Sequence, residues 1–127
     1  MKRDMELIRK ILLQIEDEHV DAAIYNLKIE DYNLATIAYH CNLLFQEDLI
    51  MDYTVLRGDG QKTDFGVSGL TWAGHDFLDN IRSDGTWDKT KSIIKEKGLP
   101  MTLEVVKTIA STLISSMVEG VVKGMKI

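Results

Sequence analysis

The side chains that could carry out chemistry in this chain are few and lie far apart in the sequence. The three histidines, His19, His40 and His75, fall in different predicted elements. No His-x-x-His or Cys-x-x-Cys spacing links any of them to each other or to the single cysteine, Cys41. Protein zinc sites use several His, Cys or carboxylate ligands at short spacings, so we predict no metal site. Cys41 has apolar neighbours and no nearby base, which predicts a buried, unreactive thiol.

Two further patterns have the residue types of a chemical site without its arrangement. Asp76 and Asp79 are three apart on one predicted helix face, which is more typical of a solvated face than of an acid–base pair. The glycine-containing segment GDGQKTDFG at 58–66 lacks the Lys-Ser/Thr ending of a phosphate loop. It also lacks the alternating oxygen ligands of a calcium loop. We therefore predict no enzymatic activity and no cofactor.

Charge is distributed unevenly along the 127 residues, whose formal net charge is −5. Residues 1–85 hold 8 Lys/Arg and 16 Asp/Glu, whereas residues 86–127 hold 7 and 4. The stretch 29–56 contains five carboxylates and no Lys or Arg. Because Lys and Arg supply most contacts to nucleic-acid phosphates, this stretch would tend to repel a duplex.

Length and composition are those of an ordinary soluble globular protein, with 45% hydrophobic and 28% charged residues. The least polar stretch, 108–118, has eleven uncharged residues, fewer than the roughly 20 that a membrane-spanning helix needs. The N-terminus mixes acids and bases at helical spacing, unlike a signal peptide. Together with the lone cysteine, these features predict a cytoplasmic protein without a membrane span.

Apolar spacing predicts helices at 5–15, 34–47, 72–81, 87–97 and 102–122. Asp4, Asn33, Thr71 and Thr86 precede four of them as expected N-caps, and Asp48 stands where a left-handed residue would end the second. The imperfect alternation of apolar and polar residues at 22–30 predicts a short strand or extended segment. Segments 51–56 and 65–70 predict a hairpin whose glycine-marked loop is too long for a two-residue turn.

The order of helix, hairpin and helix from Leu34 to Ile81 is that of the back half of a winged helix-turn-helix. We therefore expect an α+β fold with a winged-helix domain at 1–82 and a two-stranded wing. Additional C-terminal helices at 83–127 would pack on this domain or form a dimer interface.

Four blocks of sequence carry a resemblance to a known family: MKRDMELIRKIL at the start, IAYHCNLLFQEDLI at 37–50, LTWAGHDFLDNIR at 70–82 and TWDKTKSIIKEKG at 86–98. The chain resembles a family of short, uncharacterised proteins from Firmicute bacteria and their prophages, a domain of unknown function similar to the YjcQ-like proteins. The resemblance implies a winged-helix fold and a bacterial or phage origin, and it brings no activity or ligand. The chain departs from transcription regulators of this shape because little room remains between Lys28 and Leu34 for a full positioning helix.

The candidate partner or nucleic-acid face lies on the second predicted helix and on the wing. If Ile37, Cys41 and Leu44 face inward, the opposite face and the wing present Thr36, Tyr39, His40, Leu43, Arg57 and Lys62. These side chains can hydrogen-bond bases or phosphates. Alternatively, His40 and Tyr39 partly cover the core while Leu43 contacts another element. The missing cations favour this alternative, or a protein partner.

The last predicted helix carries an apolar stripe at spacings of three and four, which includes Val106, Ala110, Leu113 and Met117. Such a surface needs a cover. The cover is either the chain's own first helix or the same helix of a second subunit, and we expect a homodimer through these four residues.

Two functions from different classes remain. The first is a regulatory or adaptor module that acts mainly through protein contacts. The second is a dimeric DNA-binding transcriptional regulator. In that case its phosphate contacts would come from the N-terminal cations Lys2, Arg3, Arg9 and Lys10 and from the basic helix at 86–97.

Overall fold

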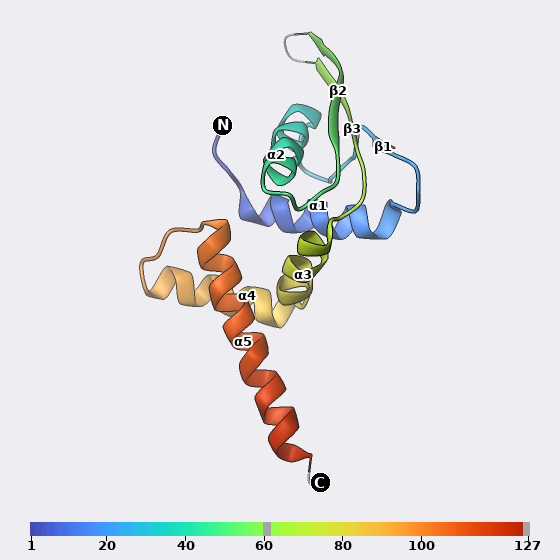
Figure 1. Cartoon of the computed structure of the whole chain (residues 1–127). Coiled ribbons are helices and arrows are strands. Elements are labelled where there is room, and N and C mark those ends of the chain that lie inside the picture. Colours follow the sequence, from blue (N-terminus) through green and yellow to red (C-terminus); the bar gives the residue numbers. More distant parts are fainter. Residues whose placement is uncertain (60–61, 126–127) are drawn as a thin grey trace. The chain divides into compact units, whose positions relative to one another are not determined.

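The computed structural model describes residues 1–59 and 62–125, without the side chains of 57–63 (Figure 1). The protein is α+β, as predicted. Its elements in chain order are α1 (Met5–Glu18), β1 (Ile24–Tyr25), α2 (Leu34–Gln46), β2 (Tyr53–Asp59), β3 (Lys62–Val67), α3 (Trp72–Ile81), α4 (Asp84–Glu96) and α5 (Leu103–Gly124). The chain divides into two compact units, Met1–Leu78 and Asp79–Ile127.

The sheet has three antiparallel strands in the order β1-β3-β2, so the predicted two-stranded wing was incomplete. The short strand β1 joins through Ile24 opposite Val67 and Tyr25 opposite Gly66. Asn26 then closes the pairing. Its backbone N–H donates to the Phe65 carbonyl at 2.9 Å, and its side-chain oxygen accepts from the Phe65 N–H at 2.9 Å.

The β2–β3 hairpin is longer than the sequence predicts. The strands are paired as far as Asp59 opposite Lys62, so only residues 60 and 61 stand between them and the predicted long loop was wrong. Glycines and polar residues that are typical of a loop instead lie within the ladder. A register shift between Val55 and Arg57 lets the strands twist through this region.

Helix starts follow local capping chemistry. Asp4 caps α1 by accepting the N–H groups of Glu6 and Leu7, and Asn33 caps α2 by accepting the Thr36 N–H at 2.8 Å, both as predicted. The prediction for α4 was wrong, because Ser83 is its cap and Thr86 is buried one turn inside the helix. Asp84 in that first turn complements the helix dipole.

The end of α2 positions the start of α3, which lies in the first unit. Asp48 has a φ of 56°, the left-handed conformation that the sequence predicts there. The chain turns at this residue and returns Leu49 and Ile50 to the core. Thr71 caps the start of α3, because its hydroxyl oxygen accepts the Gly74 N–H at 3.0 Å. A Cβ atom on Gly74 would lie 2.0 Å from the Leu49 carbonyl oxygen, so only glycine permits this approach.

Each unit has its own buried side chains. In the first unit, the inner stripe of α2 is buried as predicted, together with the apolar face of α1 and the centre of β3 (Ile37, Cys41, Leu44, Leu7, Ile11, Leu12, Ile15, Phe65 and Val67). In the second unit α4 and α5 contact each other, and its buried residues include Trp87, Thr90, Ile94, Val106 and Ala110.

Candidate functional site

The side chain of His40 is fully buried, so its predicted place on a partner or nucleic-acid face was wrong. Its Nε2 atom accepts the backbone N–H of Asp4 at 2.9 Å, and its Nδ1 atom lies 2.8 Å from the Thr36 carbonyl oxygen. Because an N–H must point at Nε2, that nitrogen is the acceptor and Nδ1 carries the proton. His40 therefore bonds α2 to the start of α1.

Asp4 is the centre of a polar cluster that the sequence did not predict. While one carboxylate oxygen caps α1, the other accepts the Tyr32 hydroxyl at 3.0 Å. Burial and this hydrogen bond to Asp4 raise the pKa of Tyr32. The cluster therefore fastens α1, the turn before α2, and α2 itself to one another. The signals for it in the sequence were the expected capping role of Asp4 and the position of His40 three residues after the inward-facing Ile37.

The other predicted face residues are divided between the core and the solvent. Tyr39 is 39% exposed and meets the His40 ring edge-on at 5.5 Å, while Thr36 and Leu43 are partly buried. This is the arrangement of the alternative in which α2 mainly covers the core. Arg57 and Lys62 belong to β2 and β3, but their side chains lie outside the described part of the structure.

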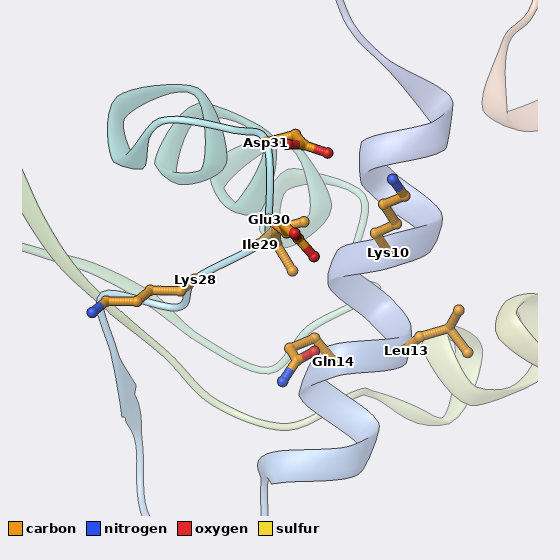
Figure 2. Close-up of a pocket in the computed structure, with 7 residues that line it drawn as sticks. All are labelled: Lys10, Leu13, Gln14, Lys28, Ile29, Glu30 and Asp31. Atoms are coloured by element: carbon orange, nitrogen blue, oxygen red, sulfur yellow. The ribbon is translucent and has the colours of Figure 1, made fainter.

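A shallow hollow of about 330 Å³ lies between α1 and the segment before α2. Figure 2 shows Lys10 and Gln14 on α1 facing Ile29 and Glu30, whereas Lys28 points away from α1. The Lys10 ammonium lies 5.7 Å from the centre of the Tyr32 ring. With two lysines and two carboxylates around it, the hollow has no net charge that would select an anionic or cationic ligand.

A second hollow of about 260 Å³ brings together two of the scattered histidines. His19 and His75 line it with Glu16, and His75 Nδ1 lies 4.0 Å from a Glu16 carboxylate oxygen. Among the described residues, no group of three or more His, Cys, Asp or Glu side chains is arranged to hold a metal ion. Cys41 is buried, and burial raises the pKa of its thiol to about 12.

The stripe predicted as a dimer interface on α5 is split between two environments. Val106 and Ala110 are fully buried in the chain, which corrects their assignment to a second subunit, and Leu113 is partly buried. Met117 is 60% exposed. The helix beyond it, which we call the α5 tail (residues 117–125), exposes every residue, including Val118, Val121, Val122 and Met125.

Of the described helices, only α5 is long and apolar enough to cross a membrane by length and composition. Its best window has a mean hydropathy of 1.4, although few of its residues are buried. The expected absence of a membrane span stays a prediction.

A groove of about 450 Å³ lies within the second unit, between the start of α4 and the middle of α5. We call it the α4–α5 groove. Its lining residues are Ser83, Gly85, Thr86, Lys89, Leu113, Ser116 and Met117. The sequence identified Leu113 and Met117 but missed the α4 side, because the boundary of α4 was predicted three residues too late.

Comparison with known proteins identifies relatives without a described activity. Residues 2–100 match the sequence profile of the family described as Hypothetical protein (DUF2513), so the matched region ends before α5 begins. A protein of Haemophilus influenzae described as uncharacterized is 36% identical over 120 residues, which cover 92% of this chain and 98% of that protein. No solved structure matches the chain.

Proposed function

The chain belongs to the DUF2513 family, whose name carries no activity, and we propose that it is a non-enzymatic winged-helix module that regulates or connects other proteins through direct contacts. The order α1, β1, α2, β2, β3 and the sheet order β1-β3-β2 support a winged-helix architecture. The sequence blocks that resemble the YjcQ-like proteins favour the same architecture. Because a fold does not dictate function, the proposal depends on the surfaces.

The observation that carries the proposal is the exposed apolar surface of the α5 tail. Val121 is 64% exposed and its neighbours Val118 and Val122 are 54% and 60% exposed. Contiguous apolar surface of this kind in water marks a site that binds another apolar surface. The tail is therefore the proposed contact surface of the module.

The absence of Lys and Arg from α2, with carboxylates on both sides of the helix, supports protein rather than DNA as the partner. The turn at residues 30–32 takes the place where a helix-turn-helix has its positioning helix. No Lys or Arg lies between 29 and 56, and His40 is turned inward to Asp4. A duplex would meet carboxylates here without the phosphate anchors that supply most nucleic-acid affinity.

The second candidate is a dimeric DNA-binding regulator, and the distribution of exposed cations favours it. Lys2 and Arg3 are exposed before α1, and Lys89, Lys95 and Lys97 are exposed on or just after α4. These side chains would make the phosphate contacts that α2 cannot make.

Titration with a fluorescent duplex of random sequence at about 50 mM salt separates the two candidates. The proposal expects no binding at micromolar protein, both for the natural chain and for a matched variant with Lys89, Lys95 and Lys97 replaced by Gln. Tight binding that weakens steeply with salt, and that the triple variant loses, would overturn the proposal in favour of the DNA-binding regulator.

A further inference from the structure

We propose that the exposed surface at the start of α3 binds an arginine-bearing segment of a partner protein, with Trp72 as its apolar anchor. The inference rests on the proposed function, because it adds a second contact surface to a module that acts through proteins and states the chemistry of the partner. Trp72 is the first residue of α3 and is 84% exposed, whereas the other tryptophan of the chain, Trp87, is 2% exposed. Tryptophan is highly buried on average, and together with arginine it is enriched at the energetic centres of protein interfaces.

Carboxylates flank Trp72 on two elements. The turn after α2 lies against the first turn of α3, because the Thr71 hydroxyl donates to the Asp48 carbonyl. Asp48 and its neighbour Glu47 are exposed on that turn. Asp76 is also exposed, and it follows Trp72 by four residues, one turn further along the same side of the helix. We call Trp72 and these three carboxylates the Trp72 face.

The charges of the Trp72 face select a cationic partner. No Lys or Arg occurs at 29–56 or at 63–81, the two stretches that contain the turn and α3. The nearest titratable neighbour on the helix is His75, whose Nδ1 atom lies 4.0 Å from a Glu16 carboxylate oxygen on α1. A segment that carries positive charge is therefore attracted to this surface, and a segment that carries negative charge is repelled.

A guanidinium group matches both parts of the Trp72 face. It is planar and stacks on an aromatic ring, and it can donate two parallel hydrogen bonds to one carboxylate. Four residues of helix rise by about 6 Å, so an arginine that stacks on Trp72 can also reach Asp76. A lysine ammonium would supply the charge without the planar stack or the paired hydrogen bonds. Arginine is therefore the side chain that uses the whole surface.

Three other covers suit the Trp72 face less well. A DNA duplex and an anionic lipid surface would both bring negative charge to the carboxylates. A second copy of the chain would bring mainly lysines, because residues 86–127 contain seven lysines and no arginine.

Titration of the full-length chain into fluorescein-labelled oligoarginine, followed by anisotropy at about 50 mM salt, tests the proposal. Trp72→Ala should weaken binding about fivefold to tenfold, because it removes the stacking surface. Asp76→Asn should weaken binding about threefold. The matched control is Asp17→Asn, which removes one exposed carboxylate near the end of α1 and should change the dissociation constant by less than about twofold. Circular dichroism and urea unfolding check that each variant is folded.

Two further measurements separate stacking from general attraction between opposite charges. Oligolysine of equal length should bind the natural chain more weakly than oligoarginine does, and the difference should shrink in Trp72→Ala. In Trp87→Phe, Trp72 is the single tryptophan, so its emission should shift and its quenching by acrylamide should fall when oligoarginine binds. The anisotropy comparison does not depend on this variant.

Equal binding of oligoarginine by the natural chain and by Trp72→Ala, or equal losses in Asp76→Asn and Asp17→Asn, would overturn the inference. Flotation with anionic lipid vesicles or self-association in sedimentation, if Trp72→Ala abolishes it, would also overturn the inference, because a lipid or a second copy would then be the occupant. Salt-steep duplex binding by a chain that still binds oligoarginine through Trp72 would overturn the proposed function alone. Oligoarginine binding that ignores Trp72, in a chain that does not bind a duplex, would overturn the inference alone.

Discussion

His40 Nε2 accepts the backbone N–H of Asp4 at 2.9 Å, across 36 positions of sequence. The bond joins the middle of α2 to the residue that caps α1. His40 has both ring nitrogens occupied, and Asp4 has hydrogen bonds at both carboxylate oxygens. A buried polar cluster that is fully satisfied stabilises one arrangement of its elements, and it becomes costly when one member is removed.

His40→Ala should therefore destabilise the protein by about 2–4 kcal/mol. The substitution leaves a cavity and deprives the Asp4 N–H and the Thr36 carbonyl of their side-chain partner. Urea unfolding followed by circular dichroism measures the loss. Gln46→Ala, at an exposed position of the same helix, is the matched control and should change stability by less than about 0.5 kcal/mol. Equal effects of the two substitutions would contradict the structural role of His40.

Asp48→Gly should stabilise the protein. Asp48 has a φ of 56°, which costs a residue with a side chain about 1–2 kcal/mol relative to its preferred conformations. Glycine removes this cost but loses more backbone entropy on folding, so the net gain should be about 0.5–1 kcal/mol. The thermal midpoint should rise by a few degrees. Asp52→Gly, at a nearby exposed residue without positive φ, should lower it, and a fall for both variants would contradict the prediction.

The residues that the sequence predicts correctly are those governed by local chemistry. Asp4 and Asn33 cap helices through hydrogen bonds to backbone N–H groups two or three residues ahead, which do not depend on distant parts of the chain. Asp48 ends α2 because aspartate tolerates the left-handed conformation. Periodicity likewise places Ile37, Cys41 and Leu44 inside.

What the sequence does not predict depends on distant partners. His40 follows Ile37 by three residues and precedes Leu44 by four, so helical spacing places it beside the apolar stripe of α2. Its polar ring suggests an exposed position, and the Asp4 N–H that satisfies the buried ring comes from α1. The β2–β3 pairing extends to Asp59 and Lys62. The sequence prediction ended the strands earlier because the glycine and polar residues near the tip are types that usually occur in loops. On α5 the apolar spacing continues from Ala110 to Val121, so periodicity cannot tell which half α4 covers.

Gly74→Ala should be among the most destabilising single-methyl changes in the chain. The new Cβ would lie 2.0 Å from the Leu49 carbonyl oxygen, a backbone atom that cannot move aside without shifting α3 from the turn after α2. We expect a loss of at least about 2 kcal/mol in urea unfolding. Gly120→Ala is the control, because a Cβ there meets nothing within 4 Å and alanine favours the helix. It should be neutral or stabilising, and a tolerated Gly74→Ala would contradict the close approach.

Cys41 should make the stability fall at alkaline pH. Burial raises the pKa of its thiol to about 12, so the folded protein keeps the proton while the unfolded chain releases it above about pH 9. This contribution is complete below pH 9 and is lost as the pH rises toward 12, at up to about 1.4 kcal/mol per pH unit. Unfolding free energies at pH 7.5, 9 and 10 measure the slope.

Tyr32 and Tyr53 titrate in the same direction, because burial raises the pKa of each phenol above its ordinary value of 10.0. Their effect begins at higher pH than that of Cys41, so the comparison between pH 7.5 and 9 isolates the thiol, whereas by pH 10 the phenols of the unfolded chain also ionise. Cys41→Ala should lose most of the pH dependence of the unfolding free energy in that interval, while retaining the steeper loss of stability above it.

The burial of Cys41 also predicts that the native thiol does not react with an aromatic disulfide reagent at pH 8. In urea, the extent of the reaction should be proportional to the unfolded fraction. Rapid stoichiometric reaction in native buffer would show that the thiol is accessible, and the alkaline slope should then be absent as well.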